Sequence, residues 1–271
     1  MRRLRITNIH KTAIVESGAE IGEGVKIGPY CLVSNDAKIG DGVILDAHVV
    51  VHGNTKIGPN SRIFPFAAIG LPPQDMKYAG EQTELLIGAN NIIREHVTMH
   101  PGTTGGGKKT SVGNNCLIMV GSHVAHDCSI GDHVILVNNA TLGGHVTVEN
   151  HVVVGGMAAV HQFVRIGEHA MIGGMSGVEN DIIPYGSVMG NRAYLSGLNL
   201  IGLKRRGFRR GDIHKMRAAY RLLFAEEGTL QERLSDVSDI FGDSPYVMQI
   251  VNFVRAVSSR GLCQPKLVRA A

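Results

Sequence analysis

The sequence predicts a parallel β-helix of six-residue repeats, a β-solenoid, followed by a small α-helical domain at the C-terminus. Three observations carry this prediction. An apolar residue recurs at every sixth position through most of residues 9–178, glycine is abundant, and the repeat gives way to a helical pattern in the last third of the chain. The 271 residues include 35 glycines and no tryptophan, and only 5% are aromatic although 44% are hydrophobic. Such a composition favours a repetitive packing of Val and Ile over an ordinary globular core.

The repeat occupies 26 positions in three runs. These positions are Ile9, Val15, Ile21, Ile27, Val33, Ile39, Leu45, Val51, Ile57, Ile63, Ile69; then Ile87, Ile93, Met99; then Val112, Ile118, Val124, Ile130, Leu136, Leu142, Val148, Val154, Val160, Ile166, Ile172 and Val178. A period of six matches neither a helix nor a continuous strand, but it matches short strands joined by tight turns. Three such strands would make one triangular coil of 18 residues. A β-sandwich gives no reason for the fixed spacing. Because glycine often follows the apolar residue, we expect these glycines to supply turn conformations that side chains disfavour.

Two segments break the repeat and are predicted to be loops that leave a β-helix of residues 1–190. Residues 71–86 read LPPQDMKYAGEQTELL, and residues 101–110 read PGTTGGGKKT. Proline and glycine interrupt strand ladders, so both segments are expected outside the prism. Loops of this length on a rigid scaffold often carry function.

Residues 191–271 are predicted to form the α-helical C-terminal domain. Residues 212–227 place apolar side chains on one helical face. Thr229 and Glu232 form a capping-box pattern that opens a second helix. Ser244 and Pro245 suit the start of a third helix, which is expected to run to about Ser258.

Composition excludes several classes of protein. No apolar run approaches the roughly 18 residues of a membrane span, and the N-terminus lacks the apolar core of a secretory signal. The net charge of +4 is modest and indicates no nucleic-acid partner. The four cysteines, Cys31, Cys116, Cys128 and Cys263, show neither metal nor disulfide spacing. We therefore expect a protein of the reducing cytoplasm without membrane insertion.

A column of polar residues is the best candidate for chemistry. Residues 18 apart should stack in adjacent coils, which aligns His126, Gly144 and Gln162, with His145 and His161 beside them. His123 lies on the approach to the same corner. Three readings stay open: a general base acting on a hydroxyl, a zinc site, or solvated turn histidines. Of the two functional interpretations, a zinc site is the weaker one, because no carboxylate or cysteine stands at a convincing ligand position.

Six strings carry a resemblance to a known family. They are Gln74–Gly80, His123–Cys128, Asn138–Leu142, Gly155–Met157, Ala159–Phe163 and Gly202–Phe208. The hexad pattern resembles the hexapeptide-repeat acyltransferases, and the strings resemble the UDP-N-acetylglucosamine O-acyltransferases of lipid A biosynthesis. The resemblance extends over essentially the whole chain. It implies a left-handed coil and a homotrimer, neither of which follows from the spacing.

The resemblance also implies a reaction and assigns roles. A 3-hydroxyacyl chain would pass from acyl carrier protein to the 3-hydroxyl of UDP-N-acetylglucosamine, without a cofactor, a metal or a covalent intermediate on cysteine. His126 would be the general base, Asp127 its neighbour, and the Gly144 N–H the oxyanion donor. The expected substrate contacts are Gln74, Asp75, Met76, Lys77, His123, His145, His161, Gln162, Asn199 and Arg205. Arg205 and Arg206 would suit a diphosphate. Arg192 departs from the family pattern, which leaves its role open.

Two further features concern the acyl donor. Asn138, Gly156, Gly174 and Arg192 are expected in one column, where the two glycines would leave a groove for a long acyl chain. Residues 192–221 hold nine basic residues and one acid, a difference of +8, which favours docking of an acidic carrier protein. The rival functions are an N-acyltransferase of the same pathway, an acetyl-coenzyme A-dependent enzyme, and a non-enzymatic zinc-binding scaffold. Use of a 3-amino sugar also stays open.

Overall fold

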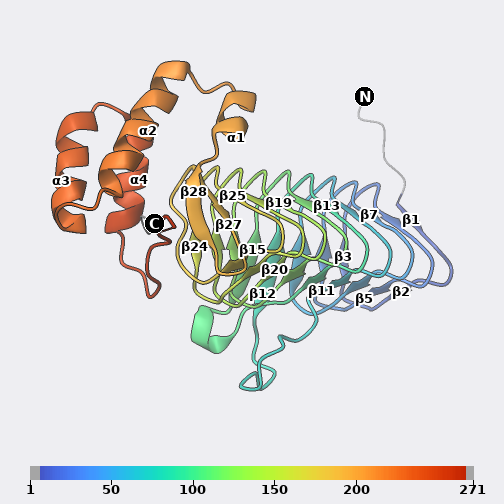
Figure 1. The fold of residues 1–271 in the computed structure, drawn as a ribbon. Coiled ribbons are helices and arrows are strands. Elements are labelled where there is room, and N and C mark those ends of the chain that lie inside the picture. Colours follow the sequence, from blue (N-terminus) through green and yellow to red (C-terminus); the bar gives the residue numbers. More distant parts are fainter. Residues whose placement is uncertain (1–6, 267–271) are drawn as a thin grey trace.

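A computed structural model describes residues 7–266 and shows a three-sided solenoid with helices at one end (Figure 1). The chain passes through three parallel sheets in turn. The first sheet comprises β1 (Asn8–Ile9), β4 (Lys26–Ile27), β7 (Ile44–Leu45), β10 (Arg62–Ile63), β13 (Ile92–Ile93), β16 (Leu117–Ile118), β19 (Ile135–Leu136), β22 (Val153–Val154), β25 (Met171–Ile172), β27 (Gly186–Met189) and β28 (Tyr194–Leu198). The second comprises β2 (Ile14–Val15), β5 (Leu32–Val33), β8 (Val50–Val51), β11 (Ala68–Ile69), β14 (Thr98–Met99), β17 (His123–Val124), β20 (Thr141–Leu142), β23 (Ala159–Val160) and β26 (Gly177–Val178). The third comprises β3 (Glu20–Ile21), β6 (Lys38–Ile39), β9 (Thr55–Ile57), β12 (Glu84–Ile87), β15 (Lys109–Val112), β18 (Ser129–Ile130), β21 (Thr147–Val148) and β24 (Arg165–Ile166).

The turns between sheets form three edges, named here by the sheets they join. Edge 1–2 contains Gly156 and Gly174, edge 2–3 contains His126 and His145, and edge 3–1 contains His151. Successive coils are in register at 18 residues, as in the pairing of Val124 with Leu142 and of Leu142 with Val160. The predicted solenoid and its register are therefore confirmed. The left-handed sense of the coil rests on the family resemblance.

From β4 to β26, each side of a coil points two side chains inward. The repeat position is one of them, as with Ile27 and Leu45, and the residue two positions earlier is the other, as with Val25 and Val43, all at most 2% exposed. Cys31, Cys116 and Cys128 occupy this second inward position and are buried. Burial raises the pKa of Cys116 to about 11 and that of Cys128 to about 12, which suits core packing.

The expectation that the repeated glycines supply unusual turn conformations is wrong for most of them. The left-handed turn positions are held mainly by other residues, among them His48, Asn60, Asp127 and His145, with φ between 58° and 62°. Glycine follows the inward aliphatic residue for a different reason, which is the closeness of the next coil. A Cβ on Gly58 would lie 2.5 Å from the carbonyl carbon of Gly88.

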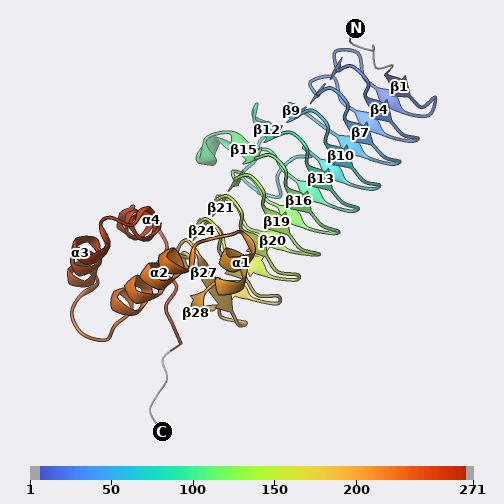
Figure 2. The same ribbon diagram turned by 90° about the horizontal axis from the view of Figure 1, so that it is seen from above.

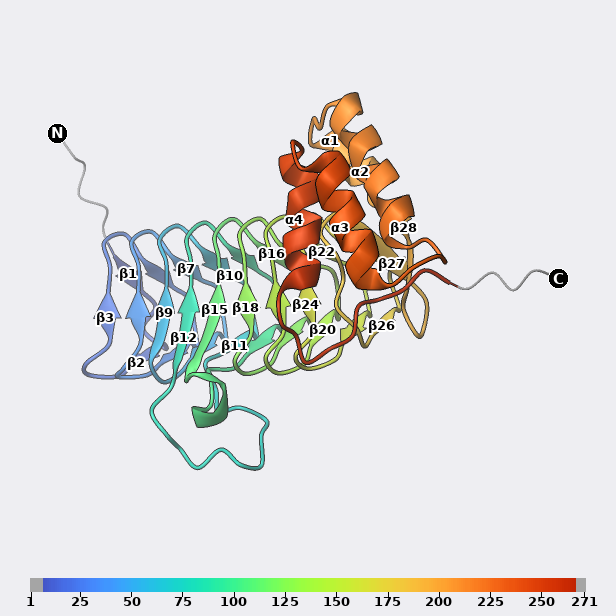
Figure 3. The same ribbon diagram turned by 90° about the vertical axis from the view of Figure 1, so that its left-hand side faces the viewer.

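Both predicted loops leave the solenoid at edge 2–3 in consecutive coils, on the same side of the prism (Figure 3). They end slightly earlier than expected, because β12 already begins at Glu84 and β15 at Lys109. The second loop contains a short 3₁₀ turn, η1 (Thr104–Gly106). We refer to residues 70–83 as the first loop and to residues 100–108 as the glycine-rich loop.

The helical region begins later than residue 191, since β28 pairs antiparallel with β27 and extends the first sheet. Up to residue 266, four helices follow: α1 (Leu200–Arg205), α2 (Arg210–Leu223), α3 (Leu230–Phe241) and α4 (Pro245–Arg255). Thr229 and Glu232 form the predicted capping box. The helices lie beside the last coils (Figure 2), and Gln249 donates a hydrogen bond of 2.7 Å to Glu168 of the solenoid. Within residues 7–266, no helix has the length and apolar character needed to cross a membrane.

Candidate active site

His126 and Asp127 form a hydrogen-bonded pair at edge 2–3. Nδ1 of His126 lies 2.8 Å from Oδ2 of Asp127. The His126 side chain is 16% exposed, whereas that of Asp127 is fully buried. The left-handed backbone of Asp127, with φ of 59°, turns its carboxylate back toward the preceding residue's ring. Since a carboxylate accepts from Nδ1–H, the lone pair of the imidazole is placed on Nε2.

The glycine-rich loop closes over the Asp127 carboxylate. The backbone N–H of Thr103 donates to both carboxylate oxygens, at 2.9 and 3.1 Å, and its hydroxyl donates to Oδ2 at 2.6 Å. The hydroxyl of Thr110 lies 2.8 Å from the Asp127 N–H, which it accepts. A Cβ on Gly106 would lie 2.0 Å from Cγ of Asp127, so only glycine fits there. No fixed spacing marks Thr103, because its contact with Asp127 depends on the loop conformation, whereas Thr110 lies in β15, 17 residues before Asp127.

Gly144 and His145 occupy the next coil, directly beside His126. A Cβ on Gly144 would lie 2.6 Å from Cε1 and 2.8 Å from Nε2 of His126, so the ring rests against the glycine backbone. Among the described residues, no acceptor pairs with the Gly144 N–H. The rings of His126 and His145 are perpendicular, with centroids 5.1 Å apart, and His145 stacks on Phe163. Burial lowers the pKa of His145, although Asp127 and Asp75 act in the opposite direction.

His123 lies one strand before the pair and is held from the preceding coil. Its Nδ1 is 2.7 Å from the hydroxyl of Thr98, and its ring is 5.3 Å from that of His100. Burial and the neighbouring His100 lower the pKa of His123, so its neutral form is favoured. His100 was not singled out from the sequence; its Nδ1 lies 2.9 Å from the carbonyl oxygen of Leu71, at the start of the first loop.

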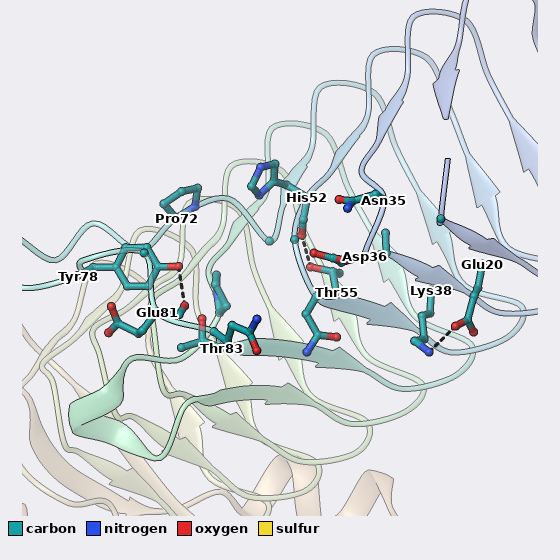
Figure 4. Close-up of a pocket in the computed structure, with 18 residues that line it drawn as sticks. Glu20, Asn35, Asp36, Lys38, His52, Thr55, Pro72, Tyr78, Glu81 and Thr83 are labelled. Atoms are coloured by element: carbon teal, nitrogen blue, oxygen red, sulfur yellow. Dashed lines mark hydrogen bonds and ion pairs between the residues drawn. The ribbon is translucent and has the colours of Figure 1, made fainter. Parts of the chain in front are cut away.

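The expected contact residues of the first loop differ in their exposure and in their influence on this edge. Asp75 is close enough to raise the pKa of His145. Gln74 and Lys77 are exposed, and Met76 is fully exposed. A cavity of about 490 Å³ lies beneath the base of this loop, toward the N-terminus, with Asp36, His52 and Tyr78 in its wall (Figure 4). None of the expected site residues lines that cavity.

His161 and Gln162 lie in the coil after that of Gly144 and His145, and both are exposed. Arg260, from the segment after α4, donates to Nδ1 of His161 and, at 2.9 Å, to the carbonyl oxygen of Gln162. The column of His126, Gly144 and Gln162 is therefore present, with a C-terminal arginine at its end. No interval in the sequence indicates Arg260, which is 99 residues from His161.

Asn199 and Arg205 belong to the helical region and lie apart from the His126 pair in this chain. Asn199 caps α1 by accepting from the Gly202 N–H, and it donates to the carbonyl oxygen of His169 at 3.0 Å. Arg205 is exposed at the end of α1. The neighbouring Arg206 donates to the carbonyl oxygen of His151 on edge 3–1, at 2.9 Å.

Gly156 and Gly174 lie on edge 1–2, so the second sheet separates them from His126 within one chain. The expected continuation of their column to Arg192 is wrong. Ile172 pairs with Val188, only 16 residues on, so Gly190 follows Gly174 in this row. Arg192 instead forms an exposed ion pair with Glu179, at 3.1 Å.

Among the residues that the structure describes, two clusters have the composition of a metal site: His126, Asp127 and His145 on edge 2–3, and His151, Glu168 and His169 on edge 3–1. The first shows that a carboxylate does stand among the histidines, contrary to the expectation. However, its Asp127 already accepts from His126 and Thr103. In the second, the rings of His151 and His169 stack at 4.7 Å with 2° between their planes, so their lone pairs cannot converge on one ion.

The basic segment lies on α1, α2 and their flanks. Arg209 pairs with Asp212 at 2.8 Å, and Lys215 pairs with Asp243 of the α3–α4 connection at 2.6 Å. The remaining charges of α2, Arg210, Arg217 and Arg221, are exposed. With the Arg192–Glu179 pair, three of the nine cations are thus offset by nearby acids, and a basic surface remains.

Comparisons with known proteins agree with this geometry. Residues 181–263 match the family model described as UDP-N-acetylglucosamine O-acyltransferase, domain 2, and residues 36–70 and 109–144 match the bacterial transferase hexapeptide model. The acyl-[acyl-carrier-protein]–UDP-N-acetylglucosamine O-acyltransferase of Bartonella bacilliformis is 50% identical over 260 residues, covering 96% of this chain and 95% of that protein. The enzyme of the same name from Caulobacter vibrioides is 58% identical over 201 residues, covering 74% of this chain and 76% of that protein.

Solved structures extend the likeness to three dimensions. The UDP-N-acetylglucosamine O-acyltransferase of Moraxella catarrhalis superposes with a TM-score of 0.91 at 40% identity, covering 94% of this chain and 99% of that chain. A crystal structure titled UDP-N-acetylglucosamine acyltransferase gives a TM-score of 0.92 at 43% identity, covering 96% of this chain and all of that chain. From these relatives and the hexapeptide fold, we conclude that the chain belongs to the acyl-[acyl-carrier-protein]–UDP-N-acetylglucosamine O-acyltransferase family.

Proposed function

We propose that this enzyme transfers a 3-hydroxyacyl chain from acyl carrier protein to the 3-hydroxyl of UDP-N-acetylglucosamine, the first step of lipid A biosynthesis, with His126 as general base. The names of the relatives support the two substrates. The observation that carries the catalytic role is the His126–Asp127 pair, in which Nδ1 is engaged at 2.8 Å and Nε2 is left to accept a proton.

The chemistry follows from these two nitrogen atoms. Nε2 of His126 takes the proton of the sugar 3-hydroxyl while that oxygen forms a bond to the thioester carbonyl carbon. The Gly144 N–H stabilises the negative charge on the carbonyl oxygen. The C–S bond then breaks, and the protonated His126 returns its proton to the departing thiolate. Asp127 keeps the imidazole oriented and stabilises its charged form. No cofactor or acyl-cysteine is needed, and the raised pKa values of Cys116 and Cys128 agree with that.

The substrate contacts extend from the pair along edge 2–3. His145 lies beside it, and we assign it to the sugar together with Gln74, Asp75, Met76 and Lys77 of the first loop. His123, His161 and Gln162 continue the wall, and Asn199 and Arg205 would receive the nucleotide. A homotrimer explains how residues far apart in one chain serve one site: the glycine groove of edge 1–2 and the helical region of one subunit would face edge 2–3 of another. A cytoplasmic location fits the four free, buried cysteines.

Turnover assays with defined substrates test this function. Purified enzyme should convert 3-hydroxyacyl carrier protein and UDP-N-acetylglucosamine to the 3-O-acyl sugar nucleotide, detected by mass spectrometry. Acetyl-coenzyme A should be a poor donor, and a UDP-glucosamine acylated at its 3-oxygen should be a poor acceptor. Preference for either of these two would instead favour one of the rival acyltransferases. Transfer to a 3-amino sugar nucleotide in the same assay would widen the acceptor class without changing the mechanism.

A further inference from the structure

Thr103 makes more contacts with the Asp127 carboxylate than His126 does. Its N–H and hydroxyl supply three hydrogen bonds, of 2.9, 3.1 and 2.6 Å, while His126 supplies one. Thr103 is 5% exposed and the carboxylate is fully buried, so water does not compete for these positions. The rotation of the carboxylate about its Cβ–Cγ bond is therefore fixed from the glycine-rich loop.

Oδ2 is the oxygen on which these contacts converge. It accepts from the Thr103 hydroxyl at 2.6 Å and from Nδ1 of His126 at 2.8 Å. The carboxylate cannot turn toward another partner without breaking the contacts from Thr103. We propose that Thr103 is a positioning residue of this enzyme, which acts through Asp127 to hold the imidazole of His126 in its working orientation. This inference rests on the proposed role of His126.

Glu81 fixes the loop that carries Thr103. One of its carboxylate oxygens accepts from both the N–H and the hydroxyl of Thr104, each at 3.1 Å. The other accepts from the Ala79 N–H at 2.9 Å, and the Tyr78 hydroxyl donates to the Glu81 backbone oxygen at 3.2 Å (Figure 4). These hydrogen bonds lower the pKa of Glu81 to about 2. The first loop and the glycine-rich loop are thus joined beside Thr103, which keeps its hydroxyl on the carboxylate.

The test compares Thr103→Val with Thr103→Ser. Valine keeps the shape and the backbone N–H but removes the hydroxyl, and a hydrogen bond to a charged group is worth enough to lower kcat by about tenfold. The KM for UDP-N-acetylglucosamine should change by less than about twofold, because Thr103 is almost completely buried and its hydroxyl is engaged by Asp127. Thr103→Ser should restore most of the lost kcat. An unchanged kcat in Thr103→Val, with the melting temperature confirming a folded protein, would overturn the proposal.

A double-mutant cycle with Asp127→Asn separates positioning from a general loss of structure. If Thr103 acts through Asp127, Thr103→Val should cause little further loss of kcat in the Asp127→Asn background. Equal losses in both backgrounds would contradict the proposal. His126→Ala provides the reference for the underlying function. Near wild-type turnover of that variant would refute the general base itself, whereas its inactivation together with a silent Thr103→Val would refute this inference alone.

Discussion

Two edges of the same solenoid carry several histidines, and they are built differently. On edge 3–1, the left-handed turn positions are His133, His151 and His169, whose rings stack in parallel at 4.7–4.8 Å. On edge 2–3, the corresponding positions are Asp127, His145 and Phe163. A carboxylate thus replaces the first ring of the row, and it accepts from the histidine just before it in the chain.

The difference shows that stacked histidines alone do not make a site. The hexad repeat offers a left-handed position at each corner, and rings placed there cover one another as packing material. Edge 2–3 adds a carboxylate in that position, glycine beside the His126 ring and two loops above it. These additions break the uniform ladder, and they leave one imidazole nitrogen free to act.

Replacing one aspartate with asparagine on each edge should give the largest difference in kcat between the two edges. Asp127→Asn should lower kcat by about 10²–10⁴-fold, because an amide no longer fixes the orientation and proton position of His126. The carboxylate of Asp132 on edge 3–1, at the position that His126 holds on edge 2–3, accepts from the backbone and side chain of Asn114 and from no histidine among the described residues. Asp132→Asn should therefore change kcat by less than about twofold. Comparable losses in the two variants would show that the edges do not differ in function.

The proposed acyl groove lies on the third edge, edge 1–2, and Gly174→Met should shorten the accepted chain. An added Cβ at Gly174 would lie 3.2 Å from the carbonyl oxygen of Gly156, and a longer side chain would fill this strip. Each excluded methylene removes about 0.8 kcal/mol, so loss of four would change the preference of wild type for a long over a short chain by about 200-fold. Competition between 3-hydroxymyristoyl and 3-hydroxydecanoyl carriers measures this ratio. If Gly174→Met leaves this ratio unchanged, the groove does not end at Gly174.

The ladder of edge 3–1 should respond to acid through stability. Burial lowers the pKa of His169 to about 4, opposed by Glu168 and reinforced by His151 and Arg206. The unfolded chain then binds the proton more readily, so stability is full above about pH 6.5 and is lost as the pH falls toward 4, by about 3 kcal/mol. Denaturation midpoints across this range measure the loss. His169→Phe, which keeps the stacking, should flatten the curve; an unaltered slope would assign the loss to other groups.

The smallest effect concerns docking of the carrier protein on α1 and α2. Raising the ionic strength from about 0.05 to 0.5 M should raise the KM for the acyl carrier protein several-fold, since screening weakens steering between opposite charges. An acyl-pantetheine thioester lacks the acidic protein and provides the matched substrate. The KM for this thioester should change less. Equal salt dependence of the two donors would show that the basic surface does not dock the carrier protein.

Sequence patterns predicted what depends on spacing. The inward aliphatic residues, the His126–Gly144–Gln162 column and the capping box of Thr229 all follow from fixed intervals. Features that depend on three-dimensional conformation were missed. Thr103 is 24 residues from Asp127 and reaches it only because of the way the loop folds. The expected place of Arg192 failed because one coil is two residues shorter than the repeat, which shifts the row to Gly190.

Chemical rescue of His126→Ala tests the central claim most directly. This variant should lose about 10²–10⁴-fold in kcat, and added imidazole, which supplies the missing base, should restore part of it. His133→Ala, at the exposed end of the edge 3–1 ladder, should keep wild-type turnover and gain nothing from imidazole. Loss of kcat only at position 126, reversed by imidazole, is the predicted result. Wild-type turnover in His126→Ala would contradict the assignment of the general base.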